Sequence, residues 1–190
     1  MAKEKSCVLM GSLLIKEAGH YFNRMIVAFP DGTLKHYDKR HLFSFAGEDR
    51  VFKAGQDRLV FEYKGFRVCP LICYDLRFPV WARNTQEIDL LIYVANWPDA
   101  RMLAWDTLLK ARAIENLCYV IGVNRVGIDN NQLRYTGHSA VYNAMGTDII
   151  QLEPAKEEIA SVTLRKSHIV ETRDKFRFLE DRDSFTINLD

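Results

Sequence analysis

The sequence has little of what would indicate a nucleic-acid-binding or membrane protein. Over 190 residues the formal net charge is +1, and both signs are mixed along the chain. No concentrated basic surface for nucleic acid or an anionic membrane is therefore expected. No apolar run approaches the roughly 20 residues that a membrane-spanning helix needs. We expect a cytoplasmic globular protein that binds neither nucleic acid nor membranes.

Cysteine is also scarce, with four residues in the whole chain: Cys7, Cys69, Cys73 and Cys118. None forms a Cys-x-x-Cys pair, so neither a zinc knuckle nor a thioredoxin-like redox site is expected. Cys7, Cys69 and Cys118 lie in apolar runs and are predicted to pack in the core. A domain of this size needs no disulfide bonds, and unpaired thiols fit a reducing cytoplasm. We expect no metal and no cofactor.

Short apolar runs that favour β-structure alternate with turns along the chain, which is 48% hydrophobic and 27% charged. The predicted strands cover residues 7–15, 21–29, 34–37, 58–63, 66–72, 90–95, 118–124, 139–143, 148–152 and 159–164. The predicted helices cover residues 80–85, 103–116 and 166–173. Because hairpins are mixed with β-α-β crossovers, we predict one α/β domain over residues 1–190, with a mixed sheet.

Cys73 occupies a position typical of a catalytic nucleophile. It follows the apolar run 66–72 directly and precedes a polar turn. Because α/β folds place their chemistry at the ends of strands, a thiol here has a rigid base and faces a cleft. A buried cysteine that packs as a small hydrophobe is the commoner case, but the neighbours of Cys73 favour the catalytic interpretation.

Those neighbours resemble a known family. Leu-Ile-Cys-Tyr-Asp-Leu-Arg-Phe-Pro at 71–79 resembles the nucleophile segment of the nitrilase superfamily, the carbon–nitrogen hydrolases. Lys-Arg-His-Leu-Phe at 39–43 resembles its lysine segment. Further matches follow in the family's order at 93–98, 111–116 and 137–139. The segment 73–79 together with Ala-Asn-Trp-Pro is most like the ω-amidase branch, which hydrolyses small 2-oxo acid amides such as 2-oxoglutaramate and 2-oxosuccinamate.

The resemblance implies a four-layer α-β-β-α sandwich and a Glu–Lys–Cys catalytic set. In the family the glutamate lies in a Phe-Pro-Glu type segment, which this sequence does not contain. Residues 1–12 resemble the strand that follows the family's second helix. We therefore expect a sandwich without its opening β-α-β-α portion, an exposed apolar strip at that place, and impaired or silent catalysis by this chain alone.

Amide hydrolysis needs a nucleophile, a group that moves protons and donors for the oxyanion. Cys73 is the candidate nucleophile, which would form a thioester and release ammonia. The backbone N–H of Tyr74 could point at the oxyanion. The resemblance assigns oxyanion binding to Lys39, whose charge would also favour the thiolate. A solvent-exposed lysine is the alternative for Lys39.

Four further residues are candidates for the pocket or for bracing it. The resemblance places Glu48 where the family often has a second glutamate that orients the lysine or the leaving group; a loop carboxylate in water is equally compatible with its sequence context. Arg77 could bind a substrate carboxylate or help Asp75 to hold the turn. Asn96 and Trp97 end the predicted strand 90–95 and should wall the pocket, although Trp97 could be plain core.

Two other interpretations remain open. A Cys–His amidase or acyltransferase would use His41 or His138 as the partner of the thiol, although a structural role fits His138 better. Alternatively, the chain is a catalytically silent relative that acts as a binding or oligomerisation module. The family resemblance implies a homodimer and a small-molecule amide as substrate.

Overall fold

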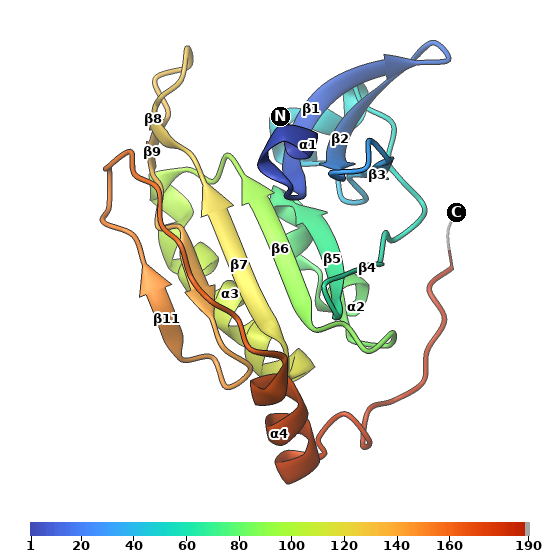
Figure 1. Cartoon of the computed structure of the whole chain (residues 1–190). Coiled ribbons are helices and arrows are strands. Elements are labelled where there is room, and N and C mark those ends of the chain that lie inside the picture. Colours follow the sequence, from blue (N-terminus) through green and yellow to red (C-terminus); the bar gives the residue numbers. More distant parts are fainter. Residues whose placement is uncertain (189–190) are drawn as a thin grey trace.

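The computed structural model describes residues 1–188, which form a six-stranded sheet, a three-stranded sheet and a two-stranded ribbon (Figure 1). The order in the large sheet is β11-β10-β7-β6-β5-β4. Its strands are β4 (Phe61–Tyr63), β5 (Phe66–Ile72), β6 (Leu90–Ala95), β7 (Tyr119–Asn124), β10 (Ala140–Tyr142) and β11 (Asp148–Gln151). The three-stranded sheet contains β1 (Leu9–Glu17), β2 (His20–Ala28) and β3 (Leu34–Asp38), and the ribbon contains β8 (Val126–Ile128) and β9 (Arg134–Thr136).

The helical segments are short except for two. They are α1 (Ala2–Lys5), η1 (Ser44–Ala46), η2 (Glu48–Arg50), η3 (Cys73–Arg77), α2 (Pro79–Ala82), η4 (Asp99–Arg101), α3 (Met102–Asn116) and α4 (Lys166–Phe176). None of the helices in residues 1–188 has the length and apolar character that crossing a bilayer requires. The α/β class with a mixed sheet, predicted from the sequence, is confirmed.

Strands β5, β6 and β7 run parallel, so their carboxyl ends lie at one edge of the large sheet. Ile72 is level with Val94 on β6, and Ala95 is level with Asn124 on β7. The first four residues of β6 are buried, as a strand covered on both faces requires. The residues that follow these three strands therefore meet in one place.

Helix α3 covers one face of the large sheet and connects β6 to β7. Its sequence has no internal Gly or Pro, which favours a helix, and its buried face is spaced as Trp105, Leu109 and Ala113. The helix approaches β7 so closely that a Cβ on Gly122 would lie 2.5 Å from a methyl carbon of Leu109. A residue larger than glycine at this position would push the helix off the sheet.

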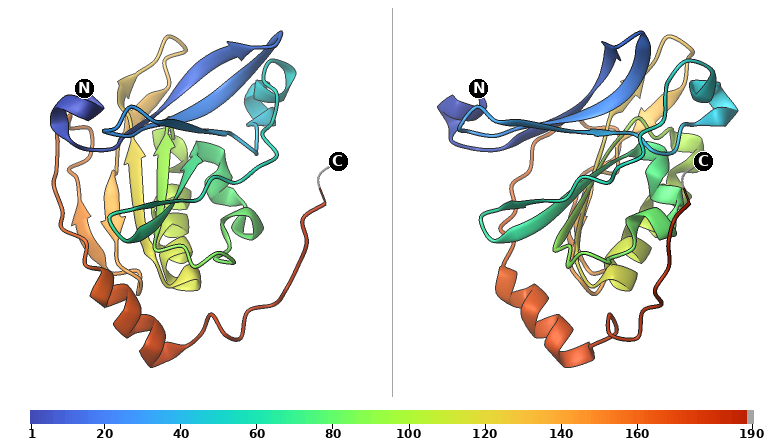
Figure 2. Two further views of the ribbon diagram at one scale, coloured as in Figure 1. Left: turned by 45° about the vertical axis from the view of Figure 1, so that its right-hand side comes forward. Right: turned by 90° about the vertical axis from the view of Figure 1, so that its right-hand side faces the viewer.

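The three-stranded sheet forms a second β-layer across the carboxyl edge of the large sheet (Figure 2). Met25 and Val27 on β2 and Tyr37 on β3 belong to the same hydrophobic core as β5 and β6. No residue of β1 is buried. Leu13 and Leu14 on this strand are 56% and 72% exposed. Because consecutive side chains of a strand lie on opposite faces, these two form no strip, and the exposed apolar strip expected from the sequence stays a prediction.

The strand predicted at 159–164 is not present. Within residues 1–188 this segment forms no ladder with any strand. Val162 and Leu164 are half-buried, while Ser161 and Thr163, which precede them in turn, are exposed. The alternation that predicted a strand is thus present, but the neighbouring backbone that would complete a ladder is not among the described residues.

Smaller differences concern turns and one cysteine. The helix predicted at 80–85 ends at Ala82, and the ribbon of β8 and β9 was not predicted. Cys7 is half-buried rather than in the core, whereas Cys69 and Cys118 are fully buried. After α4 the chain runs back past the turn before β6, where Arg182 pairs with Glu87 at 3.2 Å (Figure 2).

Candidate active site

Cys73 begins the short helix η3 at the carboxyl end of β5, and its backbone is strained. Its φ of 46° lies in the left-handed region, where a residue with a side chain pays of order 1–2 kcal/mol. This conformation turns the chain sharply out of the strand and leaves the thiol half-buried, with Sγ 4.0 Å from the carbonyl oxygen of Asn96. The N–H groups that open a helical turn have no partner within it, so the N–H of Tyr74 is available to an oxyanion.

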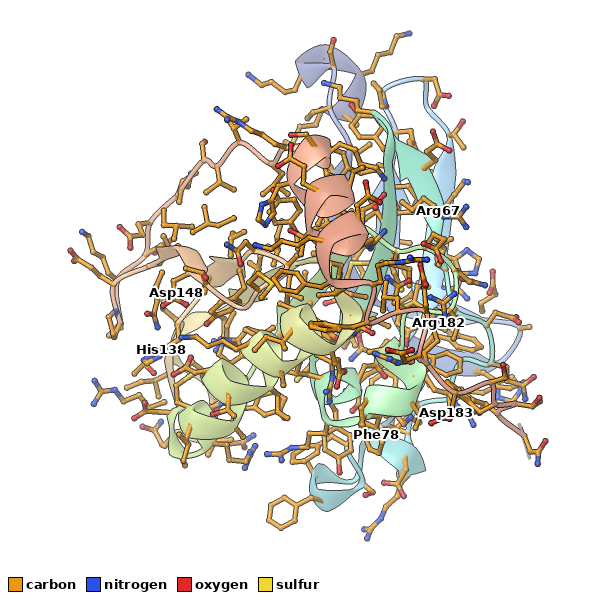
Figure 3. The ribbon with its side chains drawn as sticks, turned by 90° about the horizontal axis from the view of Figure 1, so that it is seen from below. Arg67, Phe78, His138, Asp148, Arg182 and Asp183 are labelled. Atoms are coloured by element: carbon orange, nitrogen blue, oxygen red, sulfur yellow. The ribbon has the colours of Figure 1, made fainter. Side chains whose placement is uncertain are left out.

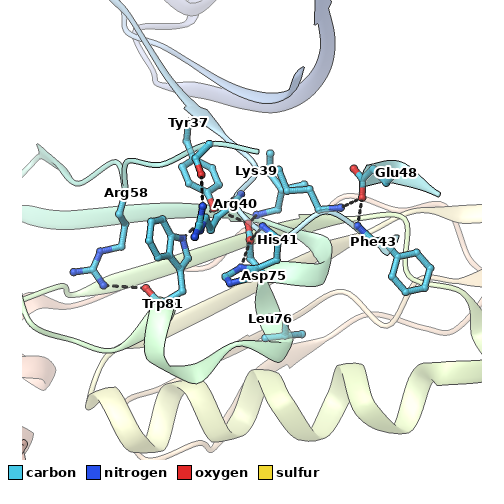
Figure 4. Close-up of polar contacts among 12 residues, drawn as sticks. Tyr37, Lys39, Arg40, His41, Phe43, Glu48, Arg58, Asp75, Leu76 and Trp81 are labelled. Atoms are coloured by element: carbon cyan, nitrogen blue, oxygen red, sulfur yellow. Dashed lines mark hydrogen bonds and ion pairs between the residues drawn. The ribbon is translucent and has the colours of Figure 1, made fainter. Parts of the chain in front are cut away.

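Asp75 holds this turn in place. Its fully buried carboxylate accepts hydrogen bonds from the N–H of Ile72 at 3.0 Å and from the hydroxyl of Tyr37 at 2.8 Å. It also accepts one from the N–H of His41 at 3.0 Å, and it lies 2.9 Å from Nδ1 of that histidine. Because Tyr37 and His41 flank the predicted lysine, Asp75 ties the lysine segment to the cysteine turn (Figure 4).

Lys39 and Glu48 form a buried ion pair. The Lys39 side chain is only 3% exposed, and its Nζ lies 2.5 Å from Oε2 of Glu48. Glu48 also accepts hydrogen bonds from the N–H of Phe43 at 2.6 Å and from Nδ2 of Asn23 at 3.0 Å. Figure 4 shows Lys39 and Phe43 converging on this carboxylate. The alternatives of a solvated lysine and a solvated loop carboxylate do not agree with this burial.

The electrostatics of Glu48 make it a weak base. Burial raises the pKa of its carboxyl group, but the charge of Lys39 and the hydrogen bonds from Lys39, Asn23 and Phe43 outweigh burial and leave the pKa below its ordinary value. A carboxylate stabilised in this way is ionised at neutral pH and accepts a proton poorly.

A first hollow of about 450 Å³ brings Cys73 together with Lys39, Glu48 and Asn23. Burial raises the pKa of the Cys73 thiol above its ordinary value of 9.0, and the charge of Lys39 opposes this shift. The cation therefore favours the thiolate, as a nucleophilic cysteine needs. Among the described residues that line this hollow, Glu48 is the one carboxylate.

A second hollow of about 230 Å³ also opens onto Cys73. Its lining includes Tyr74, whose N–H is predicted to face the oxyanion, and the predicted pocket residues Arg77, Asn96 and Trp97. The Tyr74 ring packs edge-on against Phe43, with ring centroids 4.9 Å apart. Cys73 thus lies between a hollow with the ion pair and a hollow with aromatic and cationic walls.

Trp97 lines the second hollow and is held in place by hydrogen bonds. It is 3% exposed, its backbone N–H donates to Oδ1 of Asn124 at 2.7 Å, and its ring N–H donates to the carbonyl of Arg101 at 2.8 Å. The guanidinium of Arg77 lies over its ring, 5.0 Å from the centroid. No hydrogen bond joins the Arg77 side chain to Asp75 or to the turn among residues 1–188, so the bracing role predicted for Arg77 would rest on its contact with Trp97.

Sequence reasoning missed Asn23, Arg101 and Asn124. Asn23 is a half-buried amide inside the otherwise β-favouring run of β2, and such a polar residue is itself a signal. Arg101 follows Trp97 by four positions and lines the second hollow. Asn124 ends β7 level with the end of β6, where the parallel strands predict a pocket wall.

Neither histidine considered as a partner of the thiol lines either hollow. The His41 ring stacks on Phe78 with centroids 3.7 Å apart, and Nδ1 of His138 lies 3.1 Å from Asp106. Figure 3 shows Phe78 and His138 well apart. The geometry therefore gives no support to a Cys–His mechanism. Residues 1–188 also contain no cluster of three or more His, Cys, Asp or Glu side chains that could hold a metal ion.

Comparisons with known proteins agree with this geometry. The sequence model of the family described as Carbon-nitrogen hydrolase matches residues 1–174. The chain is 44% identical to the Omega-amidase YafV of Escherichia coli over 188 residues, which cover 98% of this chain and 73% of that protein. It is 34% identical to the 2-oxoglutaramate amidase of Bacillus subtilis over 180 residues, with coverages of 92% and 68%.

Among solved structures, a CN-hydrolase superfamily protein from Xanthomonas campestris, crystallised with an arsenic adduct in its active site, matches with a TM-score of 0.96. It is 44% identical, and the match covers 98% of this chain and 73% of that chain. This confirms the nitrilase-type α-β-β-α sandwich as the fold. The chain therefore belongs to the carbon–nitrogen hydrolase family, in its ω-amidase-like branch.

Proposed function

We propose that this protein hydrolyses the ω-amide of a small 2-oxo dicarboxylic acid monoamide and releases ammonia. The observation that carries the proposal is the strained turn at Cys73, which opens onto one hollow with the buried Lys39–Glu48 pair. Relatives named as an omega-amidase and as a 2-oxoglutaramate amidase support this substrate class.

The reaction follows from the positions of these groups. The sulfur of Cys73 attacks the amide carbonyl, and the carbonyl oxygen becomes an oxyanion that the Lys39 ammonium and the Tyr74 N–H stabilise. The C–N bond then breaks, the nitrogen leaves as ammonia with a transferred proton, and a thioester remains on Cys73. Water attacks this thioester, which restores the thiol and releases the dicarboxylic acid.

Glu48 holds Lys39 in this scheme rather than taking protons. Its lowered pKa and its three donors make it a positioning carboxylate. Proton transfer by a well-placed base contributes on the order of 10²–10⁴ in rate. Glu48 is the one carboxylate among the described residues that line the hollow at Cys73, and it is a poor base. We therefore expect the polypeptide to turn over amides more slowly than the relatives named above.

The test is to incubate the polypeptide with 2-oxoglutaramate and to measure ammonia release together with the intact protein mass. The expected result is ammonia release, with a transient thioester adduct on Cys73 that is absent in Cys73→Ala. Cys7→Ala, which removes another accessible thiol, serves as the matched control and should behave as the parent protein. Ammonia release by Cys73→Ala at the parent rate would refute the proposal.

We further propose that the chain acts as a single carbon–nitrogen hydrolase domain in the cytoplasm and as a homodimer. Four free cysteines support a reducing compartment. The family resemblance supports the homodimer, which sedimentation of the purified protein tests directly.

A further inference from the structure

Two arginines in the second hollow have no hydrogen-bonding or ion-pairing partner in the described part of the chain. Neither Arg77 nor Arg101 makes a side-chain hydrogen bond or ion pair with any residue in the range 1–188, yet both line the hollow that opens onto Cys73. Arg24 and Arg173 show the contrast: Arg24 is bound by Asp38 at 2.6 Å, and Arg173 by Asp89 at 3.2 Å. A guanidinium has five N–H donors in a fixed fork, so these two offer their donors to a ligand.

Aromatic rings hold the two guanidiniums near the hollow. Arg77 lies over the Trp97 ring at 5.0 Å, and Arg101 lies over the Phe43 ring at 5.1 Å. Such cation–π contacts position a guanidinium without using its N–H donors. The rings therefore orient the cations and leave the hydrogen-bonding edges available.

Asp129, the one carboxylate among the described residues that line this hollow, does not neutralise them. Asp129 accepts hydrogen bonds from the N–H groups of Asn131 and Leu133 at 2.8 and 3.0 Å, and from the hydroxyl of Tyr135 at 2.9 Å. The N–H of Leu133 is the main cause of its lowered pKa. Asp129 is therefore committed to its own turn, and the hollow keeps an excess of positive charge.

We propose that Arg77 and Arg101 form a clamp for the carboxylate at the far end of the substrate, and that this clamp makes the enzyme selective for anionic monoamides. The proposal rests on the proposed function, because an amide carbonyl held at Cys73 leaves the rest of the molecule to enter the second hollow. A carboxylate matches the guanidinium fork in shape and charge. A neutral chain of equal length would offer neither guanidinium a hydrogen-bond acceptor.

Arg125 is the alternative cation near Cys73. It lines the first hollow and lies over the Tyr135 ring at 4.6 Å. Its charge lowers the pKa of Asp129, so part of its field is already balanced by a carboxylate. It is therefore not assigned to the clamp, and Arg125→Gln tests that choice.

The experiment separates binding from chemistry. In the Cys73→Ala background, calorimetry measures the dissociation constants of glutaramate and of pentanamide, which carries a methyl group in place of the carboxylate. Arg101→Gln and Arg77→Gln should each weaken glutaramate binding about 10- to 100-fold and leave pentanamide binding unchanged. Arg67→Gln, an exposed arginine that Figure 3 shows far from Phe78, is the matched control and should change neither.

The outcomes distinguish the clamp from the proposed function. If Cys73→Ala binds glutaramate in an arginine-dependent way while the parent protein hydrolyses no amide, the clamp stands and the proposed function fails. If the parent protein hydrolyses 2-oxoglutaramate, but the arginine variants bind glutaramate and pentanamide as tightly as Cys73→Ala does, the function stands and the clamp is wrong. A loss of glutaramate binding in Arg125→Gln alone would also overturn the assignment.

Discussion

The amino and carboxyl ends of the parallel strands differ in how their charged side chains are paired. At the amino end, fully buried Asp89 pairs with Lys166 and with Arg173 at 3.2 Å. At the carboxyl end, Cys73 has a left-handed backbone and Arg101 has no acceptor among residues 1–188. Left-handed backbone also occurs at the amino end, at Glu87 and Leu117, so the two ends differ in their charges. The amino end holds buried ion pairs that stabilise the fold, and the carboxyl end retains a cation without an acceptor, which a substrate can use.

The amino end is locked by buried polar groups as well as by ions. The Asn116 side chain accepts the N–H of Asn84 at 2.8 Å, and the Asn84 side chain donates to the carbonyls of Ile88 and Asn116, both at 3.0 Å. Arg173 adds a hydrogen bond to the carbonyl of Leu117 at 3.1 Å. These contacts join α2, α3 and α4 below the sheet, so substitutions here should act on stability alone.

The largest effect is expected at the carboxyl end. Lys39→Met removes the side chain that we propose to stabilise the oxyanion, so kcat/KM for 2-oxoglutaramate should fall about 100- to 1,000-fold. Lys35→Met, on the exposed part of β3, is the control and should leave kcat/KM unchanged. An equal loss in both variants would show that Lys39 has no special role.

The corresponding substitution at the amino end should move stability instead. Asp89→Ala leaves Arg173 and Lys166 without their buried partner and should lower the free energy of unfolding by about 3–5 kcal/mol. The kcat of the folded fraction should not change. Urea unfolding checks this against Asp174→Ala, an exposed carboxylate on α4. A fall in kcat with unchanged stability would contradict the claim that the amino end affects stability and not activity.

A smaller effect is expected from Asn23, which reaches Glu48 from β2. Asn23→Leu removes one donor to the carboxylate that holds Lys39, so kcat should fall about 10-fold while KM changes little. Steady-state kinetics beside Asn130→Leu, an exposed asparagine of the ribbon turn, isolate this contribution. Matching losses in the two variants would remove Asn23 from the site.

The pH dependence of stability sharpens the comparison further. The folded-state pKa of Glu48 lies below its ordinary value of 4.5, so its ion pair stabilises the fold above pH 4.5 and this contribution is lost as pH falls through the folded-state pKa. Glu48→Gln should therefore be less stable than the parent protein at pH 7, and the difference should shrink in acid. A difference that stays constant from pH 7 to about pH 3 would contradict this.

The smallest expected change concerns the reactivity of the Cys73 thiol. The pKa of Cys73 lies above 9.0 because of burial, and Lys39 opposes the shift. The rate of Cys73 alkylation should therefore still rise at pH 9, and Lys39→Met should move the titration to higher pH. Cys69, with a pKa raised to about 12 by complete burial, should not react while the protein is folded.

Local sequence patterns predicted the parts of the molecule that depend on local chemistry. The strand 90–95 has the predicted bounds, and the segments around Lys39 and Cys73 lie together as their order indicated. The strand predicted at 159–164 did not form, because a strand needs a neighbour that periodicity alone cannot supply. Arg101 was missed since its contact with Phe43 joins residues far apart in the chain.

The left-handed backbone of Cys73 also bears on how such a protein can evolve. Glycine and asparagine tolerate this conformation better than other residues. Any lineage released from the need for a nucleophile should therefore drift to one of them at this position. Selection for turnover must continually oppose that drift. A relative with asparagine or glycine at this position would thus be identified from that one residue as a protein that has lost catalysis.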